Sequence, residues 1–368
     1  MKERDSNFEL FRCVAMLMVI VLHFNNASMG GALRFIEPKS SGYFILHFLE
    51  SISIPAVNGF IILYGYFDSR KNTRVIRKPV LLILSVIGYN LMFYFFGLAS
   101  GIYVFTLTSF VTQLIPSNYY VILYATLFLI SPYLNVILLK LSKIRFEQML
   151  GLLIVLFSLL PTLTDTFFAF ANMTGIIGVS PVGLHGADAG YTIINFMLLY
   201  FIGGYISRYY EVKKSFLFYF GFYLISAALI FSMSLFTETA WNYSNILVIF
   251  EAAALFLAFQ KLNLGSIKWI NGISKTTFGI YLIHTNHIML ANFWGLFNIS
   301  RITSIGVPEM IFILTISVFS MFVVSSVMAY IVSLLVRPLV KSISRISLLN
   351  YTISTDEEVR IPNQIEKL

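Results

Sequence analysis

Long apolar stretches alternate with short polar or basic connections along almost the whole chain. The hydrocarbon core of a bilayer is about 30 Å thick, so a helix needs about 20 predominantly apolar residues to cross it. Stretches of roughly this kind predict ten membrane-spanning helices, over residues 8–27, 43–66, 79–99, 118–139, 148–164, 191–207, 215–235, 243–260, 273–293 and 309–336. A further segment, residues 101–116, is apolar enough to dip into the membrane or re-enter it. We therefore predict an all-α integral membrane protein with about ten transmembrane helices.

The composition agrees with a chain whose solvent is mostly lipid. Apolar residues make up 58% and charged residues 11% of the 368 residues, and the mean hydropathy is +0.83. A soluble protein of this size normally has a larger share of charged residues. The abundant phenylalanines and tyrosines are interpreted as lipid-facing and interfacial belt residues in preference to a sugar-stacking cleft.

The basic residues collect at alternate connections between the predicted spans. Cytoplasmic connections of membrane proteins carry an excess of lysine and arginine. If the N-terminus is cytoplasmic, only three of the 25 basic residues fall outside, namely Arg34, Lys39 and Arg301. This asymmetry predicts an even number of spans with both termini in the cytoplasm.

Several classes of function are disfavoured by the same composition. The net charge of +8 is spread between apolar segments rather than gathered on a polar face, so no nucleic acid is expected as a partner. Cys13 is the single cysteine, which excludes an intrachain disulfide. No two of the five histidines have the helical i, i+4 spacing and no carboxylate cluster accompanies them, so no metal is expected. Residues 1–346 are predicted to form one membrane domain and residues 347–368 a polar cytoplasmic tail.

The first predicted span carries three ionisable groups, Glu9, Arg12 and His23. Arg12 and His23 are eleven residues apart, about three helical turns and roughly 16 Å, so all three groups share one face. Ionisable groups inside a membrane usually face a cavity or a partner and serve function. The alternative is that Arg12 extends to the inner surface with Glu9 as its counter-ion, while His23 hydrogen-bonds a neighbouring helix.

Arg74 and Arg77 form an Arg-x-x-Arg pair directly before Pro79, a residue favoured in the first turn of a helix. Arginines beside a helix N-terminus suit a phosphate-bearing ligand, which the backbone N–H groups also favour. The alternative is that these arginines only mark the cytoplasmic side of the membrane and contact anionic lipid headgroups.

These features together carry a resemblance to a known family. The Glu-x-x-Arg start, Arg12 and His23 separated by ten residues, the Arg-x-x-Arg pair after a GYF-type span end, and SKTTFGIYLIH at 274–284 resemble the acyltransferase 3 family of integral membrane O-acyltransferases. The similarity extends over roughly residues 4–340, and the four motifs follow in the same order.

The resemblance implies an O-acyltransferase of the bacterial cytoplasmic membrane, most often an acetyltransferase. Such a protein takes an acyl group from cytoplasmic acetyl-CoA, or another acyl-CoA, and passes it to a sugar hydroxyl of an extracytoplasmic glycan or lipid-linked oligosaccharide. Arg74 and Arg77, with Arg12, would hold the phosphates of the donor. His23 would act as general base or carry the acyl group, supported by Glu9 and Arg12.

Three further ionisable residues are candidates for supporting roles, and the overall function has an alternative. Glu50 is predicted at an outer depth similar to that of His23, Glu251 near the middle of the eighth span, and His284 in the ninth, where the resemblance makes it a family hallmark. Intramembrane charges also occur in transporters, so a flippase for a glycan or lipid-linked precursor stays open. The oligomeric state, including a homo-oligomer, is also open.

Overall fold

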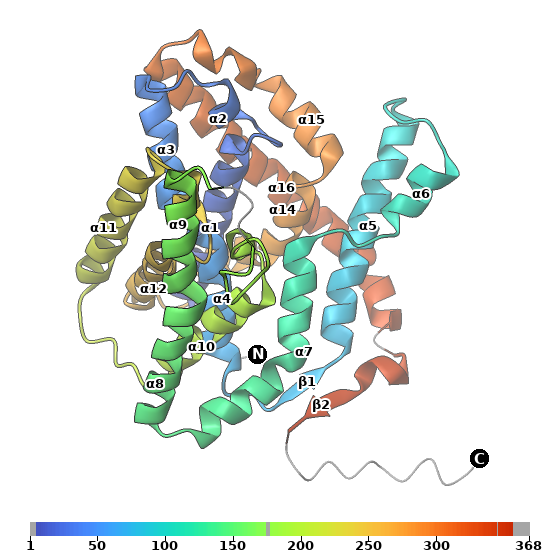
Figure 1. The fold of residues 1–368 in the computed structure, drawn as a ribbon. Coiled ribbons are helices and arrows are strands. Elements are labelled where there is room, and N and C mark those ends of the chain that lie inside the picture. The colour runs from blue at the N-terminus through green and yellow to red at the C-terminus, as the bar shows by residue number, and fades with distance from the viewer. Residues whose placement is uncertain (1–4, 174–176, 344, 356–368) are drawn as a thin grey trace, which may run out of the picture.

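The computed structural model describes residues 5–173, 177–343 and 345–355, and these are predominantly helical (Figure 1). In chain order, with η for 3-10 helices except the π-helical η1, the elements are α1 (Ser6–Asn25), α2 (Ala32–Phe35), α3 (Ser41–Ser53), α4 (Ala56–Asp68), β1 (Thr73–Val75), α5 (Arg77–Ala99), α6 (Leu107–Gln113), α7 (Tyr119–Lys140), α8 (Lys143–Ile154), η1 (Val155–Leu159), α9 (Leu160–Phe170), η2 (Asp188–Gly190), α10 (Ile193–Arg208), α11 (Phe216–Ser234), η3 (Glu238–Trp241), α12 (Ile246–Gln260), α13 (Lys268–Ile273), η4 (Ser274–Thr276), α14 (Thr277–His284), α15 (His287–Leu296), η5 (Ile299–Thr303), α16 (Val307–Ile343), η6 (Ser347–Asn350) and β2 (Thr352–Ser354). The predicted all-α class is confirmed, apart from the short β1–β2 pair.

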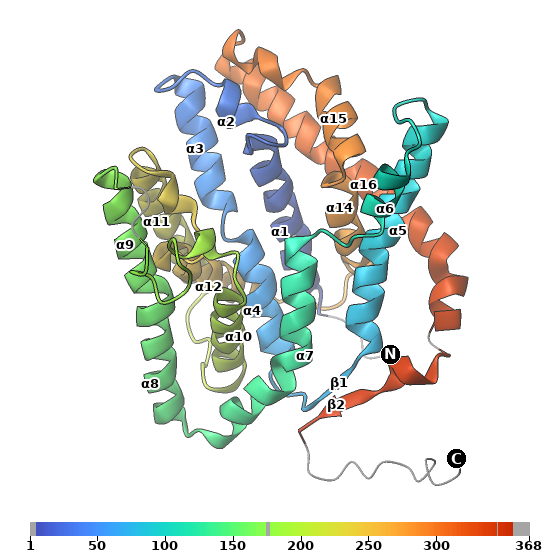
Figure 2. The ribbon, with the colours of Figure 1, turned by 45° about the vertical axis from the view of Figure 1, so that its right-hand side comes forward.

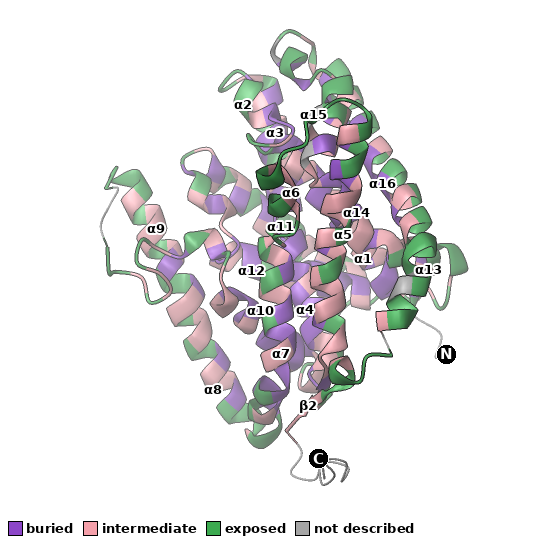
Figure 3. Cartoon of the chain, turned by 90° about the vertical axis from the view of Figure 1, so that its right-hand side faces the viewer, coloured by how far each residue is buried: buried purple, intermediate pink, exposed green. Residues whose placement is uncertain are grey.

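Eight helical stretches in the described residues are long and apolar enough to cross a membrane. They are α1, α3–α4, α5, α7, α8–α9, α11, η3–α12 and the part of α16 up to Val336. Large apolar side chains are exposed on several of them, including Phe95 on α5, Phe222 on α11 and Phe319 on α16. Figure 3 shows exposed positions on α16 and buried ones on the central helices, as expected for a bundle surrounded by lipid.

The other two predicted spans are shorter or broken. The segment predicted at 191–207 is α10, a helix of 16 residues. The segment predicted at 273–293 is divided into η4, α14 and part of α15, because Asn286 leaves the helical path and caps α15 by accepting a hydrogen bond from the Ile288 N–H. The total of ten spans therefore stays a prediction.

Helix α1 lies in the centre of the bundle (Figure 2). It contacts α3 and α4, which follow it, and also α12, α14 and α16 from the second half of the chain. Phe11, Ile20 and Phe24 are fully buried among these neighbours. The central position explains why α1 can carry ionisable side chains at membrane depth, since they meet protein rather than lipid.

The start of α1 and strand β2 lie at the same end of the molecule (Figure 1). There β1 and β2 pair in antiparallel fashion, with Arg74 opposite Ile353. Within the predicted tail, residues 347–355 include η6 and β2, whereas residues 356–368 and the N-terminal Lys2 and Arg4 lie outside the described residues.

Candidate functional site

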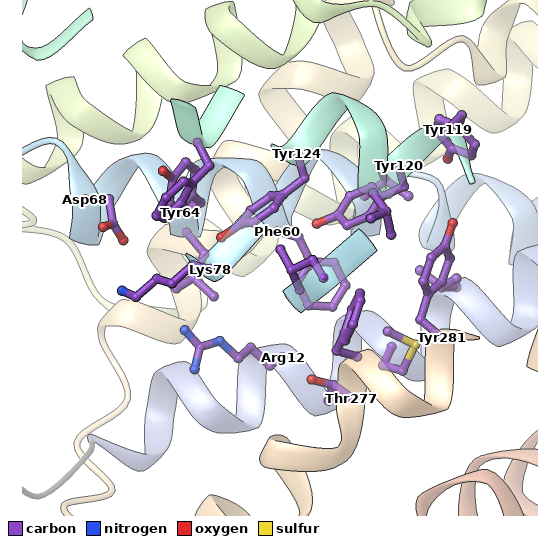
Figure 4. Close-up of a pocket in the computed structure, with 18 of the residues that line it drawn as sticks. Arg12, Phe60, Tyr64, Asp68, Lys78, Tyr119, Tyr120, Tyr124, Thr277 and Tyr281 are labelled. Carbon is purple, nitrogen blue, oxygen red and sulfur yellow. The ribbon is translucent and has the colours of Figure 1, made fainter. Parts of the chain in front are cut away.

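A cavity of about 530 Å³ lies between α1, α4, α5, α7 and α14. Helix α1 contributes Arg12, Met16, Val19 and His23, which recur at the spacing of one helical face. Arg12 and His23 thus line the same cavity, about three helical turns apart. Figure 4 shows the cavity with Arg12, Lys78 and Asp68 at one end and Tyr119 and Tyr281 at the other.

The charged end of the cavity lies on the side of the molecule that carries the β1–β2 pair. Asp68 is the last residue of α4 and Lys78 the second residue of α5, and β1 falls between them. Lys71, from the same connection, also lines the cavity. Lys71 and Lys78 therefore face the cavity on the side of the molecule that is predicted to be cytoplasmic.

His23 is paired with a second histidine from a distant helix. Its Nδ1 lies 2.8 Å from Nε2 of His284, which is fully buried at the end of α14. Nδ1 of His284 lies 2.7 Å from the carbonyl oxygen of Ile280. A carbonyl oxygen only accepts hydrogen bonds, so His284 donates from Nδ1 and, when neutral, accepts at Nε2. Nδ1 of neutral His23 is then the donor in the pair.

This chain of hydrogen bonds fixes the tautomer of neutral His23. Because its Nδ1 carries the proton, its Nε2 keeps a free lone pair, and the side chain lines the cavity. An imidazole nitrogen in this state can accept a proton or act as a nucleophile. The geometry thus gives His23 the protonation pattern that acid–base or covalent catalysis needs.

Glu9 holds the guanidinium of Arg12. Nη1 of Arg12 lies 2.7 Å from Oε1 of Glu9, one helical turn away. The other carboxylate oxygen of Glu9 accepts a hydrogen bond from the hydroxyl of Ser274. Glu9 does not line the cavity itself. It connects the first motif of the sequence to the SKTTFGIYLIH segment and positions Arg12 at the cavity wall.

The two arginines of the Arg-x-x-Arg pair lie outside the cavity lining. Arg74 is only 2% exposed, and its donors reach protein acceptors at 2.8 to 3.5 Å, namely the hydroxyls of Ser131 and Tyr200 and the carbonyl oxygens of Asp68, Lys71 and Thr73. Arg77 donates to the side-chain oxygen of Asn350 in the C-terminal segment at 2.9 Å. The structure thus does not place Arg74 and Arg77 beside Arg12 at the cavity. It places Lys71 and Lys78 there instead.

Two of the predicted supporting residues are also outside the lining. Glu50 accepts a hydrogen bond of 2.8 Å from Asn25, two residues beyond His23, and among the described residues it forms no hydrogen bond with His23 itself. Glu251 is fully buried in α12, and neither of its carboxyl oxygens has a hydrogen-bond partner within the described chain. Only His284 of the supporting residues contacts His23 directly.

Tyrosines form much of the other end of the cavity, and the sequence interpretation missed them. Tyr119, Tyr120, Tyr243 and Tyr281 line the cavity, and Tyr64 and Tyr124 line it nearer the charged end (Figure 4). The lipid-facing interpretation is wrong for these side chains. A signal was present, because Tyr120, Tyr124 and Phe128 recur every four residues and so share one face of α7.

In the described part of the chain, no group of three or more His, Cys, Asp or Glu side chains is arranged to hold a metal ion. The ionisable groups that line the cavity are imidazole, guanidinium, ammonium, carboxylate and phenol.

A comparison with protein-family models matches residues 5–338 to the family described as an acyltransferase domain. The chain belongs to the acyltransferase 3 family. No curated protein and no solved structure matches the chain. The match to the acyltransferase 3 family includes every helix that lines the cavity and ends before β2. Together with its apolar helices, this makes the protein a multi-pass membrane protein of an acyltransferase family.

Proposed function

We propose that this protein is a membrane O-acyltransferase that takes an acyl group, in the first instance acetyl, from cytoplasmic acyl-CoA and transfers it to a sugar hydroxyl at the outer side of a bacterial plasma membrane. The observation that carries the proposal is that His23, whose Nδ1 is paired with His284, lines a cavity that is cationic at one end and rich in tyrosine at the other. Family membership supports acyl transfer, and the cavity supports the identities of donor and acceptor.

The residues of the cationic end fit an acyl-CoA. Arg12, Lys71 and Lys78 line it, and phosphate groups are bound by such side chains. The apolar wall between the two ends, including Met16, Val19 and Leu82, suits a pantetheine arm. The thioester would then lie near His23.

The tyrosine-rich end suits the acceptor. The rings of Tyr120 and Tyr281 lie edge to face, with centroids 5.6 Å apart, and both line the cavity. Tyrosine offers an apolar face to the ring of a sugar and a hydroxyl to its polar groups. A sugar bound there would present a hydroxyl to the region of His23.

His23 would carry out the chemistry. Nε2 accepts the proton of the acceptor hydroxyl while that oxygen bonds to the thioester carbonyl carbon, the carbon–sulfur bond breaks, and the proton passes to the thiolate. In the two-step alternative, Nε2 bonds to the carbonyl carbon first and the carbon–sulfur bond breaks, which releases the thiolate. The acceptor oxygen then bonds to the carbonyl carbon, the carbon–nitrogen bond of the acyl-imidazole breaks, and the hydroxyl proton is left to protonate the thiolate. Both routes yield one ester and one thiol.

Release of free thiol from acetyl-CoA in proteoliposomes, with a bacterial glycan extract as acceptor, tests the proposal. We expect release by the wild type and a loss of at least about 100-fold in His23→Ala, since general acid–base catalysis contributes 10²–10⁴-fold. His47→Gln is the matched control. His47 is a buried histidine that contacts Ser234 at 3.1 Å and does not line the cavity, so its replacement should leave turnover nearly unchanged.

Two results would overturn the proposal. One is thiol release that is indifferent to His23. The other is no release by folded wild type with any common acyl donor while a labelled glycan precursor still crosses the membrane, which would establish the transporter alternative.

A further inference from the structure

The connection between α4 and α5 and the first turn of α5 carry five cations, and the structure gives them different surroundings. Arg70 donates to the carbonyl oxygen of Ser207, and Arg77 donates to Asn350, so both contact other parts of the chain. Arg74 is buried and surrounded by protein acceptors. Lys71 and Lys78 remain, and both line the cavity.

Lys78 is an exposed cation at the cavity that lacks a counter-ion from the described chain. Within the described chain its ammonium has no carboxylate in ion-pairing distance and no hydrogen-bond acceptor, and the nearest aromatic ring is Phe128, with its centroid 5.8 Å away. Lys71, in contrast, forms an ion pair of 2.9 Å with Asp68. Asp68 also lies 3.7 Å from Nη2 of Arg74, so this one carboxylate is shared by two cations.

Arg12 lines the same end of the cavity as Lys78, from the wall formed by α1. Figure 4 shows the side chains of both residues projecting into the same end of the cavity. Arg12 keeps 31% of its side chain exposed despite its ion pair with Glu9, whereas the side chain of Arg74 is 2% exposed. The end of the cavity therefore holds more positive than negative charge, and an anionic ligand would relieve the excess.

We propose that Lys78, together with Arg12, binds the phosphates of the acyl donor, and that Arg74 is a positioning residue that holds the connection between α4 and α5 in shape. This assignment rests on the proposed acyltransferase function. It moves the donor-binding role from the Arg-x-x-Arg pair to the residue that directly follows it. Arg74 acts through the carbonyl oxygens of Asp68, Lys71 and Thr73, whose positions in turn place Lys71 and Asp68 at the cavity.

The decisive comparison is between Lys78→Gln and Arg77→Gln. The two residues are adjacent cations at the start of α5, so both variants lose one positive charge at the same depth and the same side of the bundle. They differ in that only Lys78 lines the cavity. Each variant is assayed by thiol release in proteoliposomes with two donors: acetyl-CoA, and S-acetylpantetheine, which has the same thioester and no phosphate.

We expect Lys78→Gln to raise the KM for acetyl-CoA by about 10-fold or more, as for the loss of a charge-assisted hydrogen bond, with kcat little changed. The kcat/KM of the same variant for S-acetylpantetheine should stay at the wild-type value, because that donor has no phosphate to lose. Arg77→Gln should stay within about twofold of the wild type with acetyl-CoA. Equilibrium binding of coenzyme A, which requires no turnover, should likewise be weaker for Lys78→Gln than for the wild type and Arg77→Gln.

The assignment is overturned if Lys78→Gln impairs both donors equally, which would indicate general damage, or if Arg77→Gln weakens acetyl-CoA binding and Lys78→Gln does not. If the wild-type protein still turns over acetyl-CoA in either of these cases, only the assignment fails and the proposed function stands. Wild-type protein that releases no thiol and binds no coenzyme A would remove the proposed function and this assignment together.

Discussion

At the scale of single residues, the contact between His23 and His284 sets the tautomer of neutral His23. The two residues are 261 positions apart, and the lone pair on His23 Nε2 follows from the Ile280 carbonyl at the far end of the chain of hydrogen bonds. His284 does not line the cavity, so under the proposed function it would act through His23, as a positioning residue.

Replacing His284 tests this role. We expect His284→Ala to lower kcat by roughly 100-fold with little change in the KM for acetyl-CoA, because His23 loses the acceptor that keeps its proton on Nδ1. His284→Gln should recover a large part of the loss, since an amide oxygen can accept the same hydrogen bond. The measurement is steady-state thiol release across a range of pH. Equal losses in both variants, or a pH profile identical to that of the wild type in both, would assign His284 to packing alone.

The candidate site was predictable where it depends on one helix and not where it depends on several. Glu9, Arg12 and His23 share a face of α1 because of their spacing, and Arg12 and His23 do line one cavity. Arg74 could not be judged in the same way. Its acceptors include Ser131 on α7 and Tyr200 on α10, and nothing in the sequence near Arg74 indicates that these helices surround it.

At the scale of elements, the close packing of α4 against α10 holds one wall of the cavity. A Cβ atom added at Gly65 would lie 2.3 Å from the carbonyl oxygen of Tyr200, and one at Gly203 would lie 2.2 Å from that of Ile62. Helices in membranes often pack through such small residues, because the backbones then approach closely. Tyr64 and Asp68, which line the cavity, flank Gly65 on α4.

Gly65→Ala should therefore destabilise the protein although alanine is the better helix former. The new methyl group meets a backbone atom that cannot rotate away, and overpacking of this kind typically costs about 1–3 kcal/mol. The melting temperature of the detergent-solubilised protein is the measurement. Gly88→Ala on α5 is the control, because a Cβ there has no neighbour within 4 Å, and we expect no loss of stability. An unchanged melting temperature in Gly65→Ala would contradict the tight α4–α10 contact.

Sequence periodicity predicted helices better than it predicted their interruptions. Seven of the eight long apolar stretches overlap predicted spans closely, whereas α8–α9 extends from Lys143 to Phe170, beyond the predicted 148–164. The break before α15 was missed because residues 273–293 were assigned to one span, although the polar residues HTNH at 284–287 interrupt the apolar pattern. The capping side chain of Asn286 and the short α14 become visible only in three dimensions. That break leaves His284 as the last residue of α14, in reach of His23.

At the scale of the whole molecule, the two ends of the cavity correspond to the two predicted sides of the membrane. The cationic end lies with β1, β2 and the start of α1, on the side where the basic connections gather (Figure 1). The tyrosine-rich end lies toward the opposite side. If this orientation is correct, a donor made in the cytoplasm and an acceptor displayed outside approach His23 from opposite directions.

Labelling of single cysteines with a membrane-impermeant maleimide tests the orientation. In a Cys13→Ala background, Ser300→Cys in the exposed connection before α16 should react in intact cells. Lys213→Cys, in the exposed connection between α10 and α11, should react only after the membrane has been opened, because the asymmetry of basic residues places it inside. The wild-type Cys13 is buried and should react in neither case. The reversed pattern would put the cationic end of the cavity outside, where it would not meet cytoplasmic acyl-CoA, so this measurement bears on the direction of transfer as well as on topology.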